Sequence, residues 1–227
     1  CNELVILPDM EKRLEAFVRM AHAIVIFPGG VGTAEEILYL LGILLSAEND
    51  AERLPLVFTG PASSKHYFER LHAFIADTLG PVAQRRYRVI LNDPVAVARE
   101  VMRGLDEVRA ERAQRDNPYF YNWALNIGID FQLPFEATHA SIAKLELHRD
   151  QPGRDLAVNL RRAFSGIVAG NVREAGIRLV ERHGPFELKG DPKILGALDR
   201  LLKDFIAQHR MRLSEPSNYV PCYRIAV

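Results

Sequence analysis

The chain has 227 residues, of which 48% are apolar and 26% charged, so it can bury a sizeable core in one large domain or two smaller ones. Lys and Arg together number 29, as do Asp and Glu, so no net charge attracts nucleic acid or an anionic membrane. The longest apolar stretch, 37–45, is too short to span a membrane, and no signal peptide is visible. Cys1 and Cys222 form no CxxC pattern, which is typical of a reducing cytosol. We therefore expect a cytoplasmic protein without nucleic-acid or membrane partners.

Short apolar runs alternate with stretches of helical periodicity in the first half of the chain. The pattern predicts strands at 3–7, 23–27, 54–58 and 87–91, and helices at about 9–20, 33–47, 64–79 and 93–115. Runs that are apolar at nearly every position indicate strands covered on both faces, so we expect an α/β fold with a doubly wound parallel sheet. Such sheets commonly have about five or more strands, so we expect further strands upstream of Cys1.

The alternation stops near 109–118, where the charge rises and a proline follows. We therefore expect two domains, an α/β domain at 1–116 and a mostly helical domain at 117–227. The second domain is predicted to have helices near 138–149, 153–183 and 191–213 and a last strand at 219–226. Its middle stretch is interrupted by Gly166, Gly170 and Gly176, and glycines there permit close helix packing or a helix break more often than they touch a ligand.

A glycine-rich stretch, FPGGVGTAEE at 27–36, joins the second predicted strand to the next helix. It lies at the carboxyl end of a parallel strand, where open α/β sheets bind ligands. Its glycines can expose backbone N–H groups, and the helix that begins near Thr33 adds unpaired donors and partial positive charge. We interpret the stretch as a phosphate-binding loop, although an ordinary strand-to-helix turn would also use glycine. It is neither a Walker motif nor a GxGxxG fingerprint, because the lysine and the last glycine of those patterns are missing.

Glu36 lies one turn into that helix, where it would repel a bound phosphate and must serve another purpose. Thr33 and Glu36 match the T-x-x-E capping box, so a capping role is one reading. The helix dipole favours an ionised Glu36 in either role. Arg13 lies in the first turns of the preceding helix, which opens at the same sheet edge, and it could meet Glu36 there. A solvated surface arginine is the alternative.

These residues resemble a known family. M-x-x-R at Met10 and Arg13, followed by P-G-G-x-G-T-x-x-E at 28–36, resembles the Lonely Guy family of phosphoribohydrolases. The stretches RLEAFVRM, LRRAFSGIVAGNVREAGIR and PCY are similar to the carboxyl-terminal half of the long bacterial nucleotide 5'-monophosphate nucleosidases, and this likeness covers essentially the whole chain. The resemblance implies a Rossmann-like domain, incomplete at its amino end, followed by a mainly helical domain.

The resemblance also implies a reaction, in which the N-glycosidic bond of a nucleoside monophosphate is hydrolysed to free base and ribose 5-phosphate without a dissociable cofactor. Glu36 would stabilise positive charge on the ribose ring and activate water, and Arg13 would orient Glu36. The resemblance further implies a homo-oligomer and control by a regulatory alarmone nucleotide, which we cannot map to residues. The residues that would hold the 5'-phosphate are Gly29, Gly30, Gly32 and Thr33.

Other functions stay open at this point. A non-catalytic nucleotide or cofactor carrier of the same superfamily would keep the loop, although the presence of both Arg13 and Glu36 argues against it. Alternatively, the segment alone is inert because part of its pocket is missing or comes from a partner subunit. Leu14 stands where short family members have a lysine, which leaves the base preference open. Lysine decarboxylation has no support, since nothing marks a pyridoxal-binding lysine.

Further polar residues are expected to have structural roles. The seven histidines show neither HExxH nor convincing metal spacing, so no metal site is expected. Asn92 and Asp93 are expected to cap the helix after them rather than to line the pocket rim. Arg161 and Arg162 are expected on a solvated helix face, with a regulatory nucleotide as the alternative.

Overall fold

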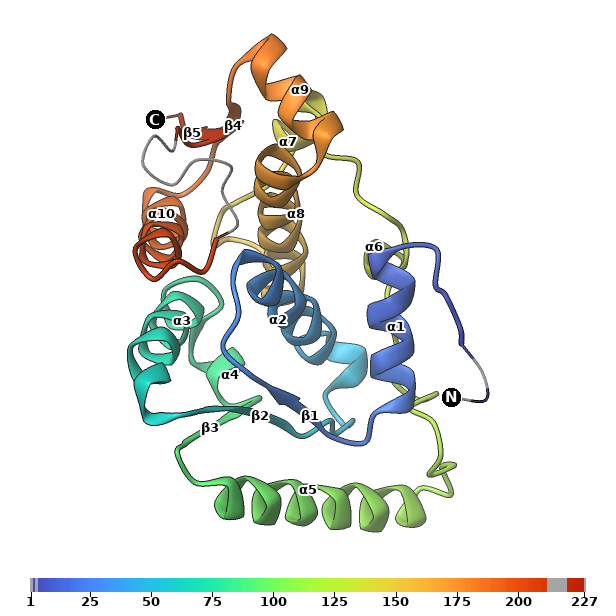
Figure 1. Cartoon of the computed structure of the whole chain (residues 1–227). Coiled ribbons are helices and arrows are strands. Elements are labelled where there is room, and N and C mark those ends of the chain that lie inside the picture. The colour runs from blue at the N-terminus through green and yellow to red at the C-terminus, as the bar shows by residue number, and fades with distance from the viewer. Residues whose placement is uncertain (1, 3, 212–219, 227) are drawn as a thin grey trace.

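Figure 1 shows the computed structural model of the chain, which describes residues 2, 4–211 and 220–226. Within these residues the main sheet has three parallel strands in the order β1-β2-β3. Helices cover both faces of this sheet, which confirms the doubly wound α/β fold predicted from the alternating pattern (Figure 1). The strands are β1 (Ile24–Ile26), β2 (Leu56–Gly60) and β3 (Arg88–Leu91).

Helices connect the parallel strands, as crossover connections require. One face of the sheet is covered by α5, which follows β3, and the other face by α2 and α3 (Figure 1). Asp93 caps α5 by accepting a hydrogen bond from the Ala96 N–H at 2.8 Å, so the capping role predicted for Asp93 is confirmed. The helical elements of this half are α1 (Met10–Met20), α2 (Val31–Leu44), η1 (Ala47–Asn49), η2 (Ala62–Ser64), α3 (Lys65–Thr78), α4 (Gly80–Gln84) and α5 (Pro94–Gln114).

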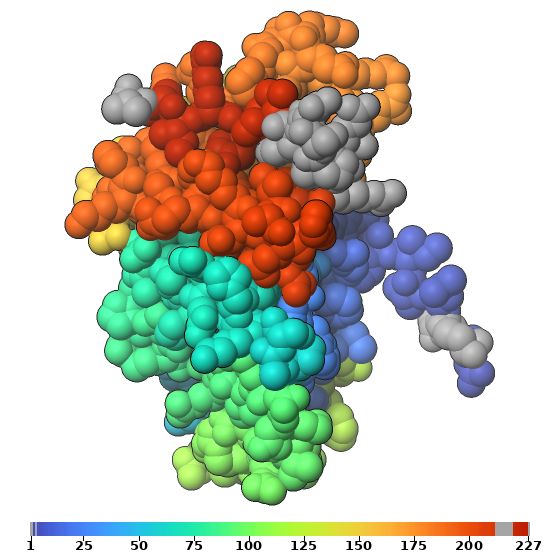
Figure 2. All heavy atoms as spheres, turned by 60° about the vertical axis from the view of Figure 1, so that its left-hand side comes forward, coloured from blue at the N-terminus to red at the C-terminus, as the bar shows by residue number. Residues whose placement is uncertain are grey.

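The second half of the chain is mostly helical, as predicted. Its described strands β4 (Phe186–Leu188) and β5 (Tyr223–Ile225) form a small parallel sheet of their own. In the space-filling view α10 lies directly against α3, so the two halves share an extended contact (Figure 2). The helices are α6 (Ile129–Gln132), α7 (His139–Ile142), α8 (Gly153–Val172), α9 (Glu174–His183) and α10 (Pro192–Ala207).

The core is continuous between the two halves, because α8 packs along α2. Eleven of the 14 residues of α2 are buried. Gly42 permits the close approach, since a Cβ there would lie 2.4 Å from the Phe131 ring and 3.2 Å from the Ala157 side chain. The boundary expected between residues 116 and 117 falls just after α5, and the division into two domains stays a prediction.

The strand expected at 3–7 is not formed by the described residues of that segment. Residues 4–7 have no regular secondary structure, and Leu4, Val5 and Ile6 are 80%, 69% and 84% exposed. A strand needs neighbours that pair its backbone groups, and in the described part of the chain β1 and β3 pair only with β2. The strand predicted at 3–7 is therefore wrong, because residues 4–7 make no ladder pairing although β1 has an open edge in the described chain.

Two helices of the second half are shorter than expected. The prediction of a helix at 138–149 is wrong after Ile142, where α7 ends. The chain then leaves the helix, and Leu147 forms a parallel bridge with Gly190. The helix predicted at 153–183 breaks at Arg173 into α8 and α9. Residues 212–219, which include the end of the helix predicted at 191–213, lie outside the described residues, as do Cys1 and Glu3.

Three glycines of α8 and α9, namely Gly166, Gly170 and Gly176, serve packing, as predicted. A Cβ would lie 2.5 Å from the Ile142 side chain at Gly166, 2.9 Å from Cys222 at Gly170 and 2.3 Å from the Ala169 carbonyl oxygen at Gly176. These positions therefore hold helices and strands close together.

Gly176 allows a direct test of this packing, because its neighbour is backbone and cannot rotate away. We expect Gly176→Ala to lower the free energy of unfolding by about 1–3 kcal/mol. The matched control is Gly196→Ala in α10, where the nearest atom to a Cβ is the end of the Arg200 side chain at 3.4 Å. That variant should be neutral or more stable by up to about 1 kcal/mol, since alanine favours a helix interior. Urea unfolding measures the free energy of unfolding of both variants. Equal changes in the two variants would contradict the packing role assigned to Gly176.

Candidate active site

The glycine loop joins β1 to α2, and two of its glycines are required by close packing. A Cβ on Gly29 would lie 1.9 Å from the Thr33 hydroxyl oxygen, and one on Gly30 would lie 2.0 Å from the Arg210 carbonyl oxygen. Gly32 differs, since a Cβ there would meet no described atom within 4 Å apart from its chain neighbours and the backbone of its own helix. Among the described residues, the side of the loop at Gly32 is therefore uncovered.

The capping box predicted for Thr33 and Glu36 is wrong. α2 begins at Val31, and Gly30 takes the N-cap position with no side-chain hydrogen bond to the helix end. The extended backbone of Gly30 allows the helix to begin earlier than the pattern indicated, which places Thr33 inside the first turn. Glu36 is thereby free to face another group.

The first turn of α2 offers backbone donors. Its first intrahelical bond runs from the Ala34 N–H to the Gly30 carbonyl at 3.1 Å, so helix geometry leaves the N–H groups of Val31, Gly32 and Thr33 without intrahelical acceptors. The helix dipole adds partial positive charge at this end. Such an arrangement suits a phosphate group, and the phosphate site itself stays a prediction.

Arg13 and Glu36 lie side by side, with Arg13 Nη2 3.2 Å from Glu36 Oε1. Asp9 fixes the start of α1 by accepting from the Lys12 N–H at 2.7 Å, which sets the turn that carries Arg13. The side chains of Arg13 and Glu36 are 51% and 37% exposed, so the pair adds at most about 1 kcal/mol to stability. Its main physical effect is to orient the carboxylate.

The charge state of Glu36 is set by two opposing effects. Partial burial raises the pKa of Glu36 above its ordinary value, and the Arg13 guanidinium counteracts the rise. A carboxylate with a raised pKa is a stronger base while it is ionised, which suits the activation of water.

An apolar groove of about 850 Å³ begins beside Thr33 and Glu36 and follows the open edge of β1. Thr33 and Glu36 are its polar lining residues within the described chain, and the others are apolar. Ligand sites commonly combine an apolar wall with a few convergent polar groups. The end of the groove at Glu36 has this character.

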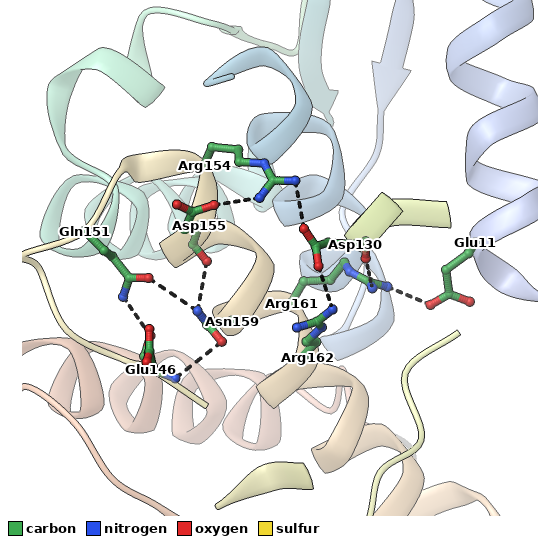
Figure 3. A network of polar contacts seen from close by, with 9 residues as sticks. All are labelled: Glu11, Asp130, Glu146, Gln151, Arg154, Asp155, Asn159, Arg161 and Arg162. Carbon is green, nitrogen blue, oxygen red and sulfur yellow. Dashed lines mark hydrogen bonds and ion pairs between the residues drawn. The ribbon is translucent and has the colours of Figure 1, made fainter. Parts of the chain in front are cut away.

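A buried cluster of charges lies behind the site, and the sequence pattern did not predict it. Arg161 on α8 donates to Glu11 at 2.8 Å (Figure 3). It also lies 3.8 Å from Glu35. The exposed fractions of Arg161, Glu11 and Glu35 are 0%, 4% and 1%. The solvated face predicted for Arg161 is therefore wrong. Its helical spacing from the apolar residues Ala157 and Phe164 was the signal that it faces the core.

Arg162 has a different environment from that of its neighbour. It is partly exposed, and its guanidinium donates to Asp130 at 3.2 Å. Arg154 donates to the other Asp130 oxygen at 2.9 Å (Figure 3). These two arginines hold the pKa of Asp130 below its ordinary value even though burial acts in the opposite direction.

In the buried cluster, one arginine faces two carboxyl groups. Glu11 is the nearer partner of Arg161, so Glu35 is left as a surplus acid. Burial raises the pKa of Glu35 to about 7, and Arg161 and a hydrogen bond with Ser165 only partly offset this. Glu35 therefore changes its charge close to neutral pH.

The side chains of two histidines that could have belonged to a site lie within hydrogen-bond distance of groups in the fold. His72 Nδ1 lies 2.8 Å from the Tyr87 hydroxyl, and His139 Nε2 lies 2.9 Å from the Gly184 carbonyl oxygen.

Within the described residues no three His, Cys, Asp or Glu side chains are grouped to hold a metal ion. Cys222 is buried, which raises the pKa of its thiol to about 12. No described helix is long and apolar enough to cross a membrane.

Two family models match the chain. One, described as "Pyrimidine/purine nucleotide monophosphate nucleosidase, C-terminal", matches residues 105–226, and one described as "Possible lysine decarboxylase" matches residues 1–101. Curated proteins named "Pyrimidine/purine nucleotide 5'-monophosphate nucleosidase" from Escherichia coli strains K12 and O157:H7 are each 53% identical over 224 residues. The match covers 99% of this chain and 49% of each relative, so the chain spans about half the length of the curated relatives it matches.

The titration of Glu35 predicts a pH-dependent stability. Between its ordinary pKa of 4.5 and about 7, native Glu35 keeps a proton that the unfolded chain releases, so this group lowers the free energy of unfolding as pH rises through that window. Glu35→Gln removes the effect. Its free energy of unfolding, relative to wild type, should therefore increase between pH 5 and pH 8, by an amount on the order of 3 kcal/mol at most.

Urea unfolding at several pH values between 5 and 8 measures this difference. The matched control is Glu69→Gln, which removes a carboxylate whose side chain is 59% exposed. A Glu35→Gln variant whose stability relative to wild type is the same at every pH would contradict the assignment.

Proposed function

This chain belongs to the pyrimidine/purine nucleotide monophosphate nucleosidase family, and from this premise we propose that it carries the catalytic residues of an enzyme that hydrolyses nucleoside 5'-monophosphates. The products are the free base and ribose 5-phosphate, and water is the second substrate. The observation that supports this most directly is the contact of Arg13 with Glu36 at 3.2 Å, beside the open first turn of α2.

The 5'-phosphate binds at the start of α2 in this proposal. The N–H groups without intrahelical acceptors and the helix dipole attract the anion, and the space at Gly32 that no other described residue fills lets it approach the backbone. A fixed phosphate explains why a nucleotide rather than a nucleoside would be the substrate. The residues of the proposed phosphate site are Gly29, Gly30, Gly32 and Thr33.

Glu36 acts at the anomeric carbon in this proposal. It lies about one helical turn, roughly 5 Å along the axis, beyond the phosphate donors, which leaves room for a ribose. Departure of the base develops positive charge on the ribose ring, and an ionised carboxylate stabilises that charge and accepts a proton from the attacking water. Arg13 holds Oε1 of Glu36, so the other carboxylate oxygen is directed to the substrate.

A non-catalytic carrier of nucleotides or cofactors is the second candidate. It would need the phosphate loop but would have no use for a carboxylate held beside it by an arginine. The pairing of Arg13 with Glu36 therefore favours hydrolysis.

Further properties belong to the proposal on the strength of the family resemblance. We propose a cytoplasmic homo-oligomer that responds to an alarmone nucleotide and has no nucleic-acid or membrane partner. The equal numbers of acidic and basic residues are compatible with this, since small anionic ligands are then met by local groups such as the α2 terminus.

Removal of the Glu36 carboxylate tests the proposed reaction. In the native full-length protein, Glu36→Ala should lower kcat for release of ribose 5-phosphate from nucleoside monophosphates by at least about 100-fold, because charge stabilisation and water activation are lost together. Glu100→Ala on α5, far along the chain from the loop, is the matched control. If Glu36→Ala is as active as wild type, Glu36 is not the catalytic residue.

Substitution of Gly32 distinguishes an effect on ligand binding from an effect on folding. Gly32→Ala should leave the protein as stable as wild type or more stable by up to about 1 kcal/mol, since the Cβ meets open space and alanine favours a helix. Its KM for nucleoside monophosphates should nevertheless rise by about 10-fold or more, because the methyl group occupies the space of the phosphate. Thermal unfolding and steady-state kinetics measure the two effects, and an unchanged KM would count against this phosphate site.

A further inference from the structure

Arg161 connects the helical half of the chain to the proposed site from behind. Its Nη1 donates to Glu11 on α1 at 2.8 Å and lies 3.8 Å from Glu35 on α2, and its Nη2 donates to the Asp130 carbonyl oxygen at 3.3 Å. The guanidinium also lies over the Tyr39 ring at 5.9 Å. Figure 3 shows the side chain reaching from α8 toward Glu11, whereas Arg154 and Arg162 of the same helix reach the Asp130 carboxylate.

The two carboxyl groups that face Arg161 are close neighbours of the proposed site residues. Glu11 comes two positions before Arg13 on α1, and Glu35 comes immediately before Glu36 on α2. Successive helical residues differ by about 100° in direction, so each helix can turn one acid to the interior and its site residue to the groove. Arg161 therefore bonds to the inner side of the α1 turn that carries Arg13, and it lies close to the inner side of the α2 turn that carries Glu36.

Several contacts position α1. The Arg13–Glu36 pair joins it to α2, its residues Leu14 and Val18 belong to the same buried core as α2, and Arg19 at its carboxyl end donates to the Asn122 carbonyl oxygen at 2.8 Å. Arg161 adds a link on the inner side of α1, because it donates to Glu11 from α8, and α8 packs along α2 over much of its length.

A buried ion pair of this kind is weak evidence of stabilisation, since well-packed apolar side chains commonly do as well or better. Its contribution is geometric, because charge-assisted bonds have narrow preferred distances and directions. The geometry that this cluster defines is the distance between Arg13 and Glu36.

We propose that Arg161 is a positioning residue for the reaction, which sets α1 against α2 so that Arg13 meets Glu36 in a productive orientation. This inference rests on the proposed function. It makes the helical half a contributor to turnover without any contact between that half and the substrate.

The test uses Arg161→Met and Arg161→Lys in the native full-length protein. We expect Arg161→Met to lower kcat by about 10- to 100-fold with a change in KM below about 3-fold, because the phosphate loop is retained while the carboxylate is misplaced. Arg161→Lys keeps the charge and should recover part of the lost kcat. The matched control, Arg162→Met, removes an ion pair from the next position of the same helix and should keep kcat within about 2-fold of wild type.

Hydrogen exchange gives a readout that is independent of activity. Amides in the first turns of α1 and α2 should exchange faster in Arg161→Met than in wild type, while those of α5 should not change. If Arg161→Met does not fold, Glu11→Gln replaces it, with the same expected direction for kcat and exchange. Wild-type kcat together with wild-type exchange in the folded variant overturns the inference.

The same pair of measurements separates the two proposals. A wild-type protein that releases no ribose 5-phosphate from any nucleoside monophosphate refutes the proposed function. In that case, amide hydrogen exchange in α1 and α2 of Arg161→Met still tests whether Arg161 positions these helices. Exchange rates equal to those of wild type would refute the positioning role as well.

Discussion

The packing of α8 along α2 is the constraint on which the other features depend. α2 begins at the glycine loop and carries Glu36, and it is apolar on nearly every other side, so it cannot be stable with one face in solvent. Burial of those sides fixes the position of the α2 axis. The fixed axis in turn determines where the N–H groups of the first turn of α2 and the Glu36 side chain point. The site thus depends on hydrophobic contacts made by residues that never approach a ligand.

Much of this arrangement could be predicted from sequence, because its signals are local. The strands β1, β2 and β3 lie in short apolar runs and the long helices have helical periodicity, and the place of Arg13 and Glu36 in the strand–helix alternation indicated that they could meet. The start of α2 was misplaced because an extended glycine at the N-cap has no sequence signal as clear as that of threonine. The strand at 3–7 was predicted from its own residues, whereas its formation depends on neighbours elsewhere.

The buried charge cluster shows a different limit. Arg161, Glu11 and Glu35 are far apart along the chain, and each is of a residue type that is normally solvated. Only the crossing of three helices makes them neighbours, and that crossing is determined by the apolar residues around them. Buried charged residues are therefore hard to predict from one sequence. The position of Arg161 within an apolar helical stripe nevertheless indicated that its side chain faces the core.

The contact of Gly30 with the Arg210 carbonyl has a consequence for modularity. The backbone after α10 lies against the glycine loop, so the surroundings of this loop come from both ends of the described chain. An α/β half separated from the helical half would lose both that backbone and the cover over α2. The helical half is accordingly a structural support of the glycine loop rather than an independent appendage.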